Sequence, residues 1–234
     1  MYIFGRFVGL LMFWLIVKPM RFLYDGKKTK LLDTHHLEEL KGKSFIIVGN
    51  HIKPRSKFLK GITLPYDSFI ARGVLKKFGV YATALTSYDA GPTSSKAKKK
   101  KKTFRKDLLV KGIVESIDLI PLNRSESDPD TIRQFKKRLD AGNIAIGIYP
   151  EGTWFRGYRK ARKFQNGLAI LAKRYGLPVI PIYVHAYNLK KKTFLCFGKP
   201  VFNVDDSGAV GKFIKEEMNR MYELVKIEAA ASTS

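Results

Sequence analysis

The sequence has little of the chemistry that builds disulfide-bonded or zinc-stabilised proteins. Its 234 residues include a single cysteine, Cys196, and neither a CxxC motif nor a cysteine and histidine pairing. An internal disulfide, a disulfide framework and a zinc site are therefore excluded. We expect the chain to work inside the cell, in a reducing compartment.

Acidic residues are also scarce. Forty-four Lys and Arg stand against twenty Asp and Glu, which gives a formal net charge of +24. This excess is compatible with three classes of partner, namely nucleic acid, an anionic membrane surface, and an acidic substrate or carrier, and charge alone does not choose among them. An apolar content of 45% excludes a wholly disordered chain, and the length is typical of one compact domain.

Long apolar runs are missing as well. Every residue from Phe7 to Val17 is apolar or glycine, but a helix counted from Ile3 would rise only ~22 Å against a ~30 Å hydrocarbon core. Lys18, Arg21 and three further lysines follow this stretch, as at a headgroup surface. The pattern predicts a helical anchor lying in one leaflet; a signal peptide, a buried core helix and a full span that recruits residues 19–24 stay as alternatives.

Beyond residue 40, short β-branched runs alternate with helical patterns. The runs at 44–49, 79–85, 117–122, 143–149, 177–184 and 193–198 predict buried strands, and those at 129–139, 165–175 and 210–229 predict helices. Such alternation indicates an α/β fold with a mostly parallel mixed sheet flanked by helices. We expect an N-terminal membrane-associated helical segment and linker at 1–40, followed by one domain at 41–234.

Residues 90–106 interrupt this alternation with six lysines in the seven positions 96–102. Like charges at this density repel one another and stay solvated, which favours an exposed loop that leads into a helix. Electrostatic contact with anionic lipid is the second interpretation. Nucleic-acid binding is disfavoured, because no aromatic residues are interleaved with the lysines.

Three motifs with polar residues each follow a predicted strand, and a fourth, apolar motif lies within another strand. They are Gly49-Asn50-His51, then Pro121-Leu122-Asn123-Arg124, then Tyr149-Pro150-Glu151-Gly152-Thr153, and last Val179-Ile180-Pro181-Ile182. In open α/β sheets, ligands bind at the carboxyl ends of the strands. The identity and order of these motifs, over about residues 44–183, resemble those of the glycerolipid acyltransferase family, which includes 1-acyl-glycerol-3-phosphate acyltransferase.

The resemblance implies roles for individual residues. His51 would be the catalytic base and Arg124 a phosphate ligand, while Glu151, Gly152 and Thr153 would form part of the acceptor pocket. The family has an arginine after the threonine, where this chain has Trp154. Arg156 and Arg159 follow closely and are the candidates for that guanidinium, and Arg156 is the one that we assign to the site.

A second departure concerns the acidic partner of the histidine. The family places an aspartate five residues after its histidine, but Ser56 occupies that position here. The next acidic residue is Asp67, displaced by an insertion of eleven residues (67 minus 56), and it precedes an apolar stretch that begins at Ser68. We expect Asp67 to cap a helix there and to orient His51, because a carboxylate on one ring nitrogen fixes the tautomer of an imidazole base.

The sequence therefore predicts an acyltransferase that moves a fatty acyl group from a thioester to the hydroxyl of a lysophospholipid such as 1-acyl-glycerol-3-phosphate. A neutral imidazole suits removal of the hydroxyl proton, and a forked guanidinium suits the phosphate. We expect no metal or cofactor, acyl-CoA or acyl carrier protein as co-substrate, and a location at the cytoplasmic face of an anionic membrane. The alternatives are a catalytically inactive relative that acts as a basic membrane-binding protein and a nucleic-acid-binding protein.

Overall fold

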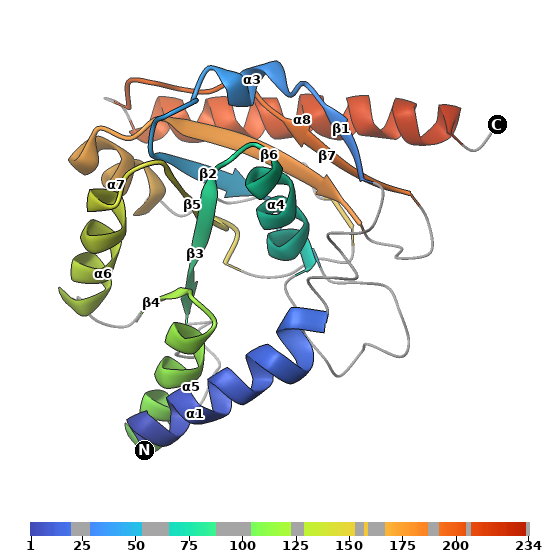
Figure 1. The fold of residues 1–234 in the computed structure, drawn as a ribbon. Coiled ribbons are helices and arrows are strands. Elements are labelled where there is room, and N and C mark those ends of the chain that lie inside the picture. Colours follow the sequence, from blue (N-terminus) through green and yellow to red (C-terminus); the bar gives the residue numbers. More distant parts are fainter. Residues whose placement is uncertain are drawn as a thin grey trace, which may run out of the picture. The chain divides into compact units, whose positions relative to one another are not determined.

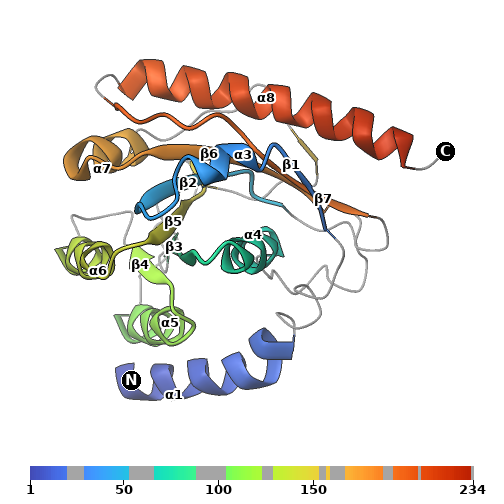
Figure 2. The same ribbon diagram turned by 45° about the horizontal axis from the view of Figure 1, so that its top comes forward.

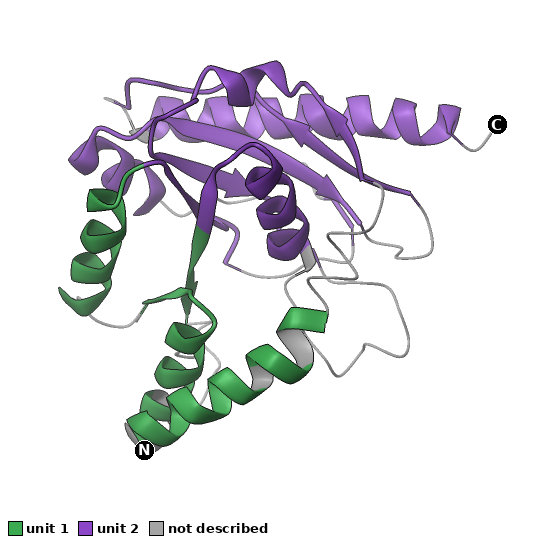
Figure 3. Ribbon diagram, viewed as in Figure 1, with its two compact units in different colours: residues 1–23, 83–142 green, residues 24–82, 143–234 purple. Residues whose placement is uncertain are grey.

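A computed structural model describes residues 1–19, 29–52, 66–87, 104–122, 129–152, 157–158, 167–186, 192–204 and 207–232. The chain divides into two compact units, residues 1–23 with 83–142 and residues 24–82 with 143–234 (Figure 3). The strands form a seven-stranded sheet in the order β1-β7-β6-β2-β5-β3-β4 (Figure 1). This order requires crossover connections, as parallel strands do.

Five strands belong to the unit of residues 24–82 and 143–234. They are β1 (Thr29–Leu32), β2 (Phe45–Gly49), β5 (Ile144–Ile148), β6 (Val179–His185) and β7 (Thr193–Phe197). β2 pairs in parallel with both β5 and β6, and β1 pairs in parallel with β7, whereas β6 and β7 are antiparallel. Every residue of β2 and β7 is buried, which explains their continuous apolar runs.

Helices cover both faces of these strands. α8 (Ser207–Ala231) and α4 (Tyr66–Lys77) lie on opposite faces, and both contact β6 (Figure 2). α7 (Gly167–Tyr175) packs on α8, and the short α3 (His35–Glu38) follows β1. The inner face of α8 repeats every three or four residues, as an amphipathic helix requires, through Val210, Ile214, Met218, Met221 and Val225, all buried.

The other unit contains mostly helices. α1 (Tyr2–Met12) continues into a π-helical turn, η1 (Phe13–Val17). β3 (Tyr81–Ser87), whose first two residues belong to the other unit, is followed by α5 (Phe104–Ser116). β4 (Ile120–Leu122) is followed by α6 (Pro129–Asp140). β3 and β4 pair in parallel.

α1 and α5 cross at small residues. A Cβ atom added to Gly5 would lie 2.6 Å from the Leu109 carbonyl oxygen, and one added to Gly9 would lie 2.5 Å from Ser116 Oγ. A Cβ on Gly112 would in turn lie 2.8 Å from the Tyr2 carbonyl oxygen. Glycine is thus required on both helices for their backbones to approach this closely.

The rest of α1 and the turn after it present large apolar side chains to the outside. Trp14 is one of them, and Lys18 Nζ lies over its ring, 3.7 Å from the ring centre. No helix among the described residues is both long enough and apolar enough to cross a membrane. The exposed side chains, 49–82% accessible, are Ile3, Phe4, Phe7, Leu10, Leu11, Trp14 and Leu15.

The sequence prediction of an α/β fold with a mostly parallel mixed sheet flanked by helices is confirmed. Three elements were not predicted: β1 and α3, which lie in the expected linker, and the full extent of α5. The membrane association of the N-terminal helix and the boundary at residue 40 stay predictions. The lysine-rich positions 96–102 lie outside the described residues.

Candidate functional site

Three polar side chains gather where β2 and β5 end. His51 follows β2, Tyr149 follows β5, and Asp67 lies in the first turn of α4. β2 and β5 are parallel, so their carboxyl ends meet at the same edge of the sheet. That edge is where open α/β sheets bind their ligands.

The end of β2 is fixed by Asn50, which is completely buried. Its amide nitrogen Nδ2 donates to the Val184 carbonyl oxygen at 2.9 Å, and its Oδ1 accepts from the Val184 amide at 2.8 Å. The side chain thus replaces a backbone partner and extends the pairing of β2 with β6 by one residue. The backbone that carries His51 is held in place as a result.

His51 and Asp67 are in direct contact. Asp67 Oδ2 lies 2.5 Å from His51 Nδ1, and the Asp67 side chain is 0% exposed, whereas that of His51 is 11% exposed. A carboxylate only accepts, so Nδ1–H donates. Asp67 Oδ2 also accepts from the Ile52 amide at 3.1 Å, and Oδ1 accepts from the Ser68 amide at 3.0 Å.

The helix begins two residues earlier than expected. α4 begins at Tyr66, so Asp67 belongs to its first turn instead of preceding a helix that starts at Ser68. Its carboxylate still accepts from first-turn and strand-end amides, which is the interaction that a capping carboxylate makes.

Tyr149 forms the wall beside the imidazole. Its ring stacks on that of His51, with 4.3 Å between the ring centres and 22° between the planes. Its hydroxyl lies 2.5 Å from Ser68 Oγ. Burial, together with the Asp67 carboxylate, raises the pKa of Tyr149 well above its usual value, so the phenol stays neutral over the ordinary pH range.

The segment after Tyr149 makes a tight turn. The Gly152 amide donates to the Tyr149 carbonyl oxygen at 3.1 Å, with Pro150 at the second position of the turn, where its ring fixes φ favourably. Gly152 has φ +61°, a conformation that other residues rarely adopt. The carboxylate oxygens of Glu151 are buried.

The structure therefore brings His51 and Asp67 together and places Glu151 and Gly152 in the turn that follows β5. Arg124, Thr153 and Arg156 lie outside the described residues. The roles assigned to all seven residues stay predictions.

Sequence reasoning gave no role to three residues that hold the site: Asn50, Ser68 and Tyr149. Two of them border predicted site residues, Asn50 before His51 and Ser68 after Asp67, and this adjacency was the available signal. The stacking of Tyr149 left no local pattern, because it joins the ends of two different strands.

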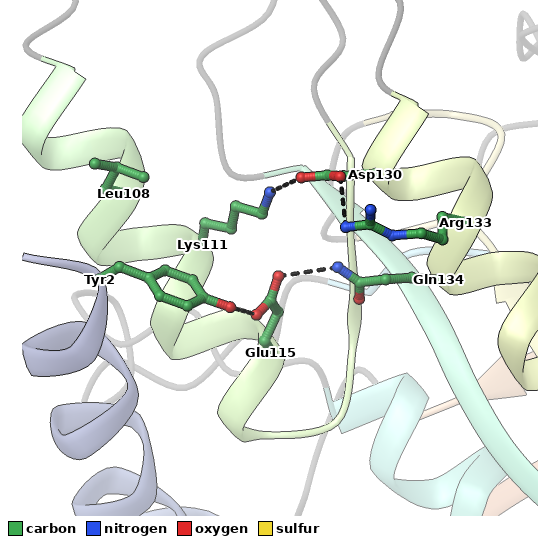
Figure 4. A pocket seen from close by; sticks show the side chains of 7 residues that line it. All are labelled: Tyr2, Leu108, Lys111, Glu115, Asp130, Arg133 and Gln134. Carbon is green, nitrogen blue, oxygen red and sulfur yellow. Dashed lines mark hydrogen bonds and ion pairs between the residues drawn. The ribbon is translucent and has the colours of Figure 1, made fainter.

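A separate polar pocket of about 360 Å³ lies in the unit of residues 1–23 and 83–142 (Figure 4). Lys111 pairs with Asp130 at 2.9 Å, Tyr2 donates to Glu115, and Gln134 donates to the same carboxylate at 2.9 Å. These contacts join α1, α5 and α6. Because its charged groups satisfy one another, we assign the pocket a structural role.

Residues 80–185 match the acyltransferase family; the match includes Arg124, Glu151, Gly152, Thr153 and Arg156 and begins after His51 and Asp67. No curated protein matches the chain.

Among solved structures, the fold is similar to the crystal structure of the 1-acyl-sn-glycerophosphate (LPA) acyltransferase, PlsC, from Thermotoga maritima. The TM-score is 0.55 at 17% sequence identity, with 90% of this chain and 80% of that chain covered. Residues 80–185 are thus similar to the acyltransferase family, and the chain has a fold like that of PlsC.

Proposed function

We propose that the protein transfers a fatty acyl group from a thioester to the hydroxyl of a lysophospholipid such as 1-acyl-glycerol-3-phosphate, with His51 as general base. The observation that carries this proposal is the contact between His51 Nδ1 and the buried Asp67 carboxylate at a sheet edge. The match of residues 80–185 to the acyltransferase family supports the reaction class.

In this mechanism the acceptor hydroxyl oxygen attacks the thioester carbonyl carbon while His51 Nε2 takes the hydroxyl proton. Asp67 holds the proton on Nδ1, which makes Nε2 the basic nitrogen, and its charge stabilises the imidazolium that forms. The new C–O bond is completed as the C–S bond breaks. The thiolate leaves and takes the proton from the imidazolium, so an ester and a free thiol are released.

Binding of the acceptor is assigned to the turn after β5 and to two arginines. Arg124 and Arg156 would hold the acceptor phosphate through forked hydrogen bonds. Gly152 and Thr153 would line the acceptor pocket, where backbone at a glycine can approach a ligand closely. Glu151 would contact a glycerol hydroxyl or orient an arginine, because a carboxylate would repel the phosphate directly.

We also propose that the protein works at an anionic membrane surface on the cytoplasmic side. The glycines of α1 face α5, and the apolar side chains of α1 face outward. Such an arrangement suits a helix that lies in the plane of a leaflet with its apolar face among the lipid chains. The net charge of +24 favours anionic lipid and an acidic donor such as acyl-CoA or acyl carrier protein.

The activity is tested by mass spectrometry of products formed from mixed lysolipids with acyl-CoA or acyl-carrier-protein donors. We expect phosphatidic acid or a related diacyl lipid from the wild type, and a rate ~10²- to 10⁴-fold lower from His51→Ala with unchanged fold. No product with any pair, or a His51→Ala rate near that of the wild type, would refute the mechanism. The first outcome would favour the catalytically inactive membrane-binding alternative.

The membrane placement is tested by liposome flotation at high salt, which screens the lysines. Phe7→Asp in α1 should reduce flotation, whereas the same change at Ile227 in α8 should not; the two side chains are 64% and 66% exposed, so the substitutions match in charge and accessibility. Removal of residues 1–24 should abolish flotation. Equal flotation of all variants would show that the anchor lies elsewhere.

A further inference from the structure

Four residues, His51 among them, form a closed ring of contacts at the site. His51 binds Asp67, Asp67 accepts from the amide of its neighbour Ser68, the Ser68 hydroxyl meets that of Tyr149, and the Tyr149 ring stacks on His51. The ring joins the ends of β2 and β5 to the first turn of α4. Within this ring, His51 is contacted by Asp67 and by Tyr149.

The Asp67 contact by itself leaves the imidazole with freedom to turn. The hydrogen bond to Asp67 restrains Nδ1 only within its angular tolerance, and the χ2 torsion of histidine is broad. The plane of the ring, and with it the direction of Nε2, needs a second constraint. The face of Tyr149, at 4.3 Å and nearly parallel, supplies that constraint.

Tyr149 is itself held in place. Its hydroxyl lies 2.5 Å from Ser68 Oγ, and Ser68 is fixed in the first turn of α4. In addition, a Cβ atom added to Gly49 would lie 3.2 Å from Tyr149 Cε1, which is closer than side chains ordinarily approach. The glycine before Asn50-His51 thus leaves the space that the tyrosine ring occupies.

We propose that Tyr149 is a positioning residue for acyl transfer, whose ring holds the plane of His51 while Ser68 holds the ring. This inference rests on the proposed function of His51. Because an aromatic face also attracts a cation, the same ring favours the imidazolium that forms when the acceptor hydroxyl loses its proton. Tyr149 thus acts on the chemical step and leaves substrate binding unaffected.

The test uses the full chain with two substitutions at the ring. Tyr149→Leu removes the aromatic face and should lower kcat about tenfold, with KM for donor and acceptor changed less than about twofold. Tyr149→Phe keeps the face and should retain about a third of kcat or more. Ser68→Ala should resemble Tyr149→Phe, because both lose the same hydroxyl contact.

A matched control removes a comparable stacked tyrosine elsewhere in the same unit. Tyr222 stacks on Tyr158 with 4.5 Å between the ring centres and 18° between the planes. Tyr222→Leu should leave the kcat of the folded enzyme within about twofold of the wild type. A tenfold loss in this control as well would reduce the Tyr149 effect to a general loss of packing and overturn the proposal.

A second readout does not depend on activity. The chain has four histidines, so the His51 side-chain NMR signals are assigned by their absence in His51→Ala. A ring stacked on the imidazole shields its carbon-bound protons, so Tyr149→Leu should move these signals downfield, and Tyr149→Phe should leave them nearly in place. A purely structural role would lower the folded fraction without moving the His51 signals of the folded protein.

Unchanged His51 signals in Tyr149→Leu, or a kcat within twofold of the wild type, would overturn the proposal. Failure of the proposed function would give a different experimental result. A wild type without transferase activity refutes the role of His51 as base, and the His51 shift alone then decides whether Tyr149 orients the ring.

Discussion

Replacement of Asp67 by asparagine removes one negative charge from the site with almost no change of shape. In the wild type, Oδ2 accepts from His51 Nδ1 and the Ile52 amide, and Oδ1 accepts from the Ser68 amide. An asparagine must place its NH₂ group at one of these two positions. If the NH₂ group points toward Ser68, it meets the Ser68 amide, which is also a donor. If it points toward Ile52, it meets the Ile52 amide and must donate to His51 Nδ1, so the imidazole proton moves to Nε2.

Both orientations are unfavourable, and their consequences can be estimated separately. One amide loses its acceptor beside a site that is 0% exposed, which lowers the free energy of unfolding by about 1–3 kcal/mol. The rate of acyl transfer by the folded enzyme also falls. Either the imidazolium loses its counter-charge, or Nε2 carries the proton and no longer accepts one. We expect kcat to fall ~10²- to 10⁴-fold, a change of about 3–5 kcal/mol in the activation free energy.

The assay measures initial rates of diacyl lipid formation and, on the same samples, denaturant unfolding. The matched control is Asp130→Asn, which removes a carboxylate that is 44% exposed and paired with Lys111, and it should leave kcat unchanged. Ser56→Ala, at the position where the family has its aspartate, should also have little effect. If Asp67→Asn keeps a kcat within threefold of the wild type, Asp67 does not orient a catalytic base.

Three further predictions concern other parts of the chain. Arg124→Ala should raise KM for a phosphate-bearing acceptor more than it lowers kcat, and Arg124→Lys should restore binding only in part; unchanged kinetics would make Arg124 a surface residue. Gly9→Ala should lower the free energy of unfolding by about 1–3 kcal/mol, because the new Cβ would lie 2.5 Å from Ser116 Oγ, whereas Gly211→Ala, with no atom within 4 Å, should be neutral or stabilising in the same denaturant titration. Burial raises the pKa of the Cys196 thiol from 9.0 to about 12, so the unfolded thiol ionises first and stability falls as pH rises above 9. The wild type should lose about 1.4 kcal/mol more than Cys196→Ala between pH 8 and pH 10, and equal losses would contradict the shift.

Much of the fold follows from local sequence pattern. The apolar runs at 44–49 and 177–184 predict buried strands, and β2 and β6 form there, because a strand covered on both faces needs an apolar side chain at nearly every position. α6 begins at Pro129 after Asp128, where a proline is favoured at the first helical position. Such signals are local, and they do not depend on the rest of the chain.

β1 and α5 show where local pattern was insufficient. The four residues of β1 are only partly buried and carry no distinctive alternation; they become a strand because β7 offers an unpaired edge. α5 follows a lysine-rich segment that suggests a solvated loop, and α1 packs against it through matched glycines. Helix pairing of this kind depends on a partner that is distant in the sequence.

The candidate site divides in the same way. The sequence by itself determined that a histidine follows a buried strand and that a Pro-Glu-Gly turn follows another, because strand ends and turns are encoded by neighbouring residues. The family resemblance led us to expect that Asp67 orients His51, but only the tertiary structure showed the two side chains in contact and Tyr149 stacked on the imidazole, because these contacts depend on the order of the strands and on where α4 begins. Such contacts join segments distant in the chain, and no periodicity along the sequence records them.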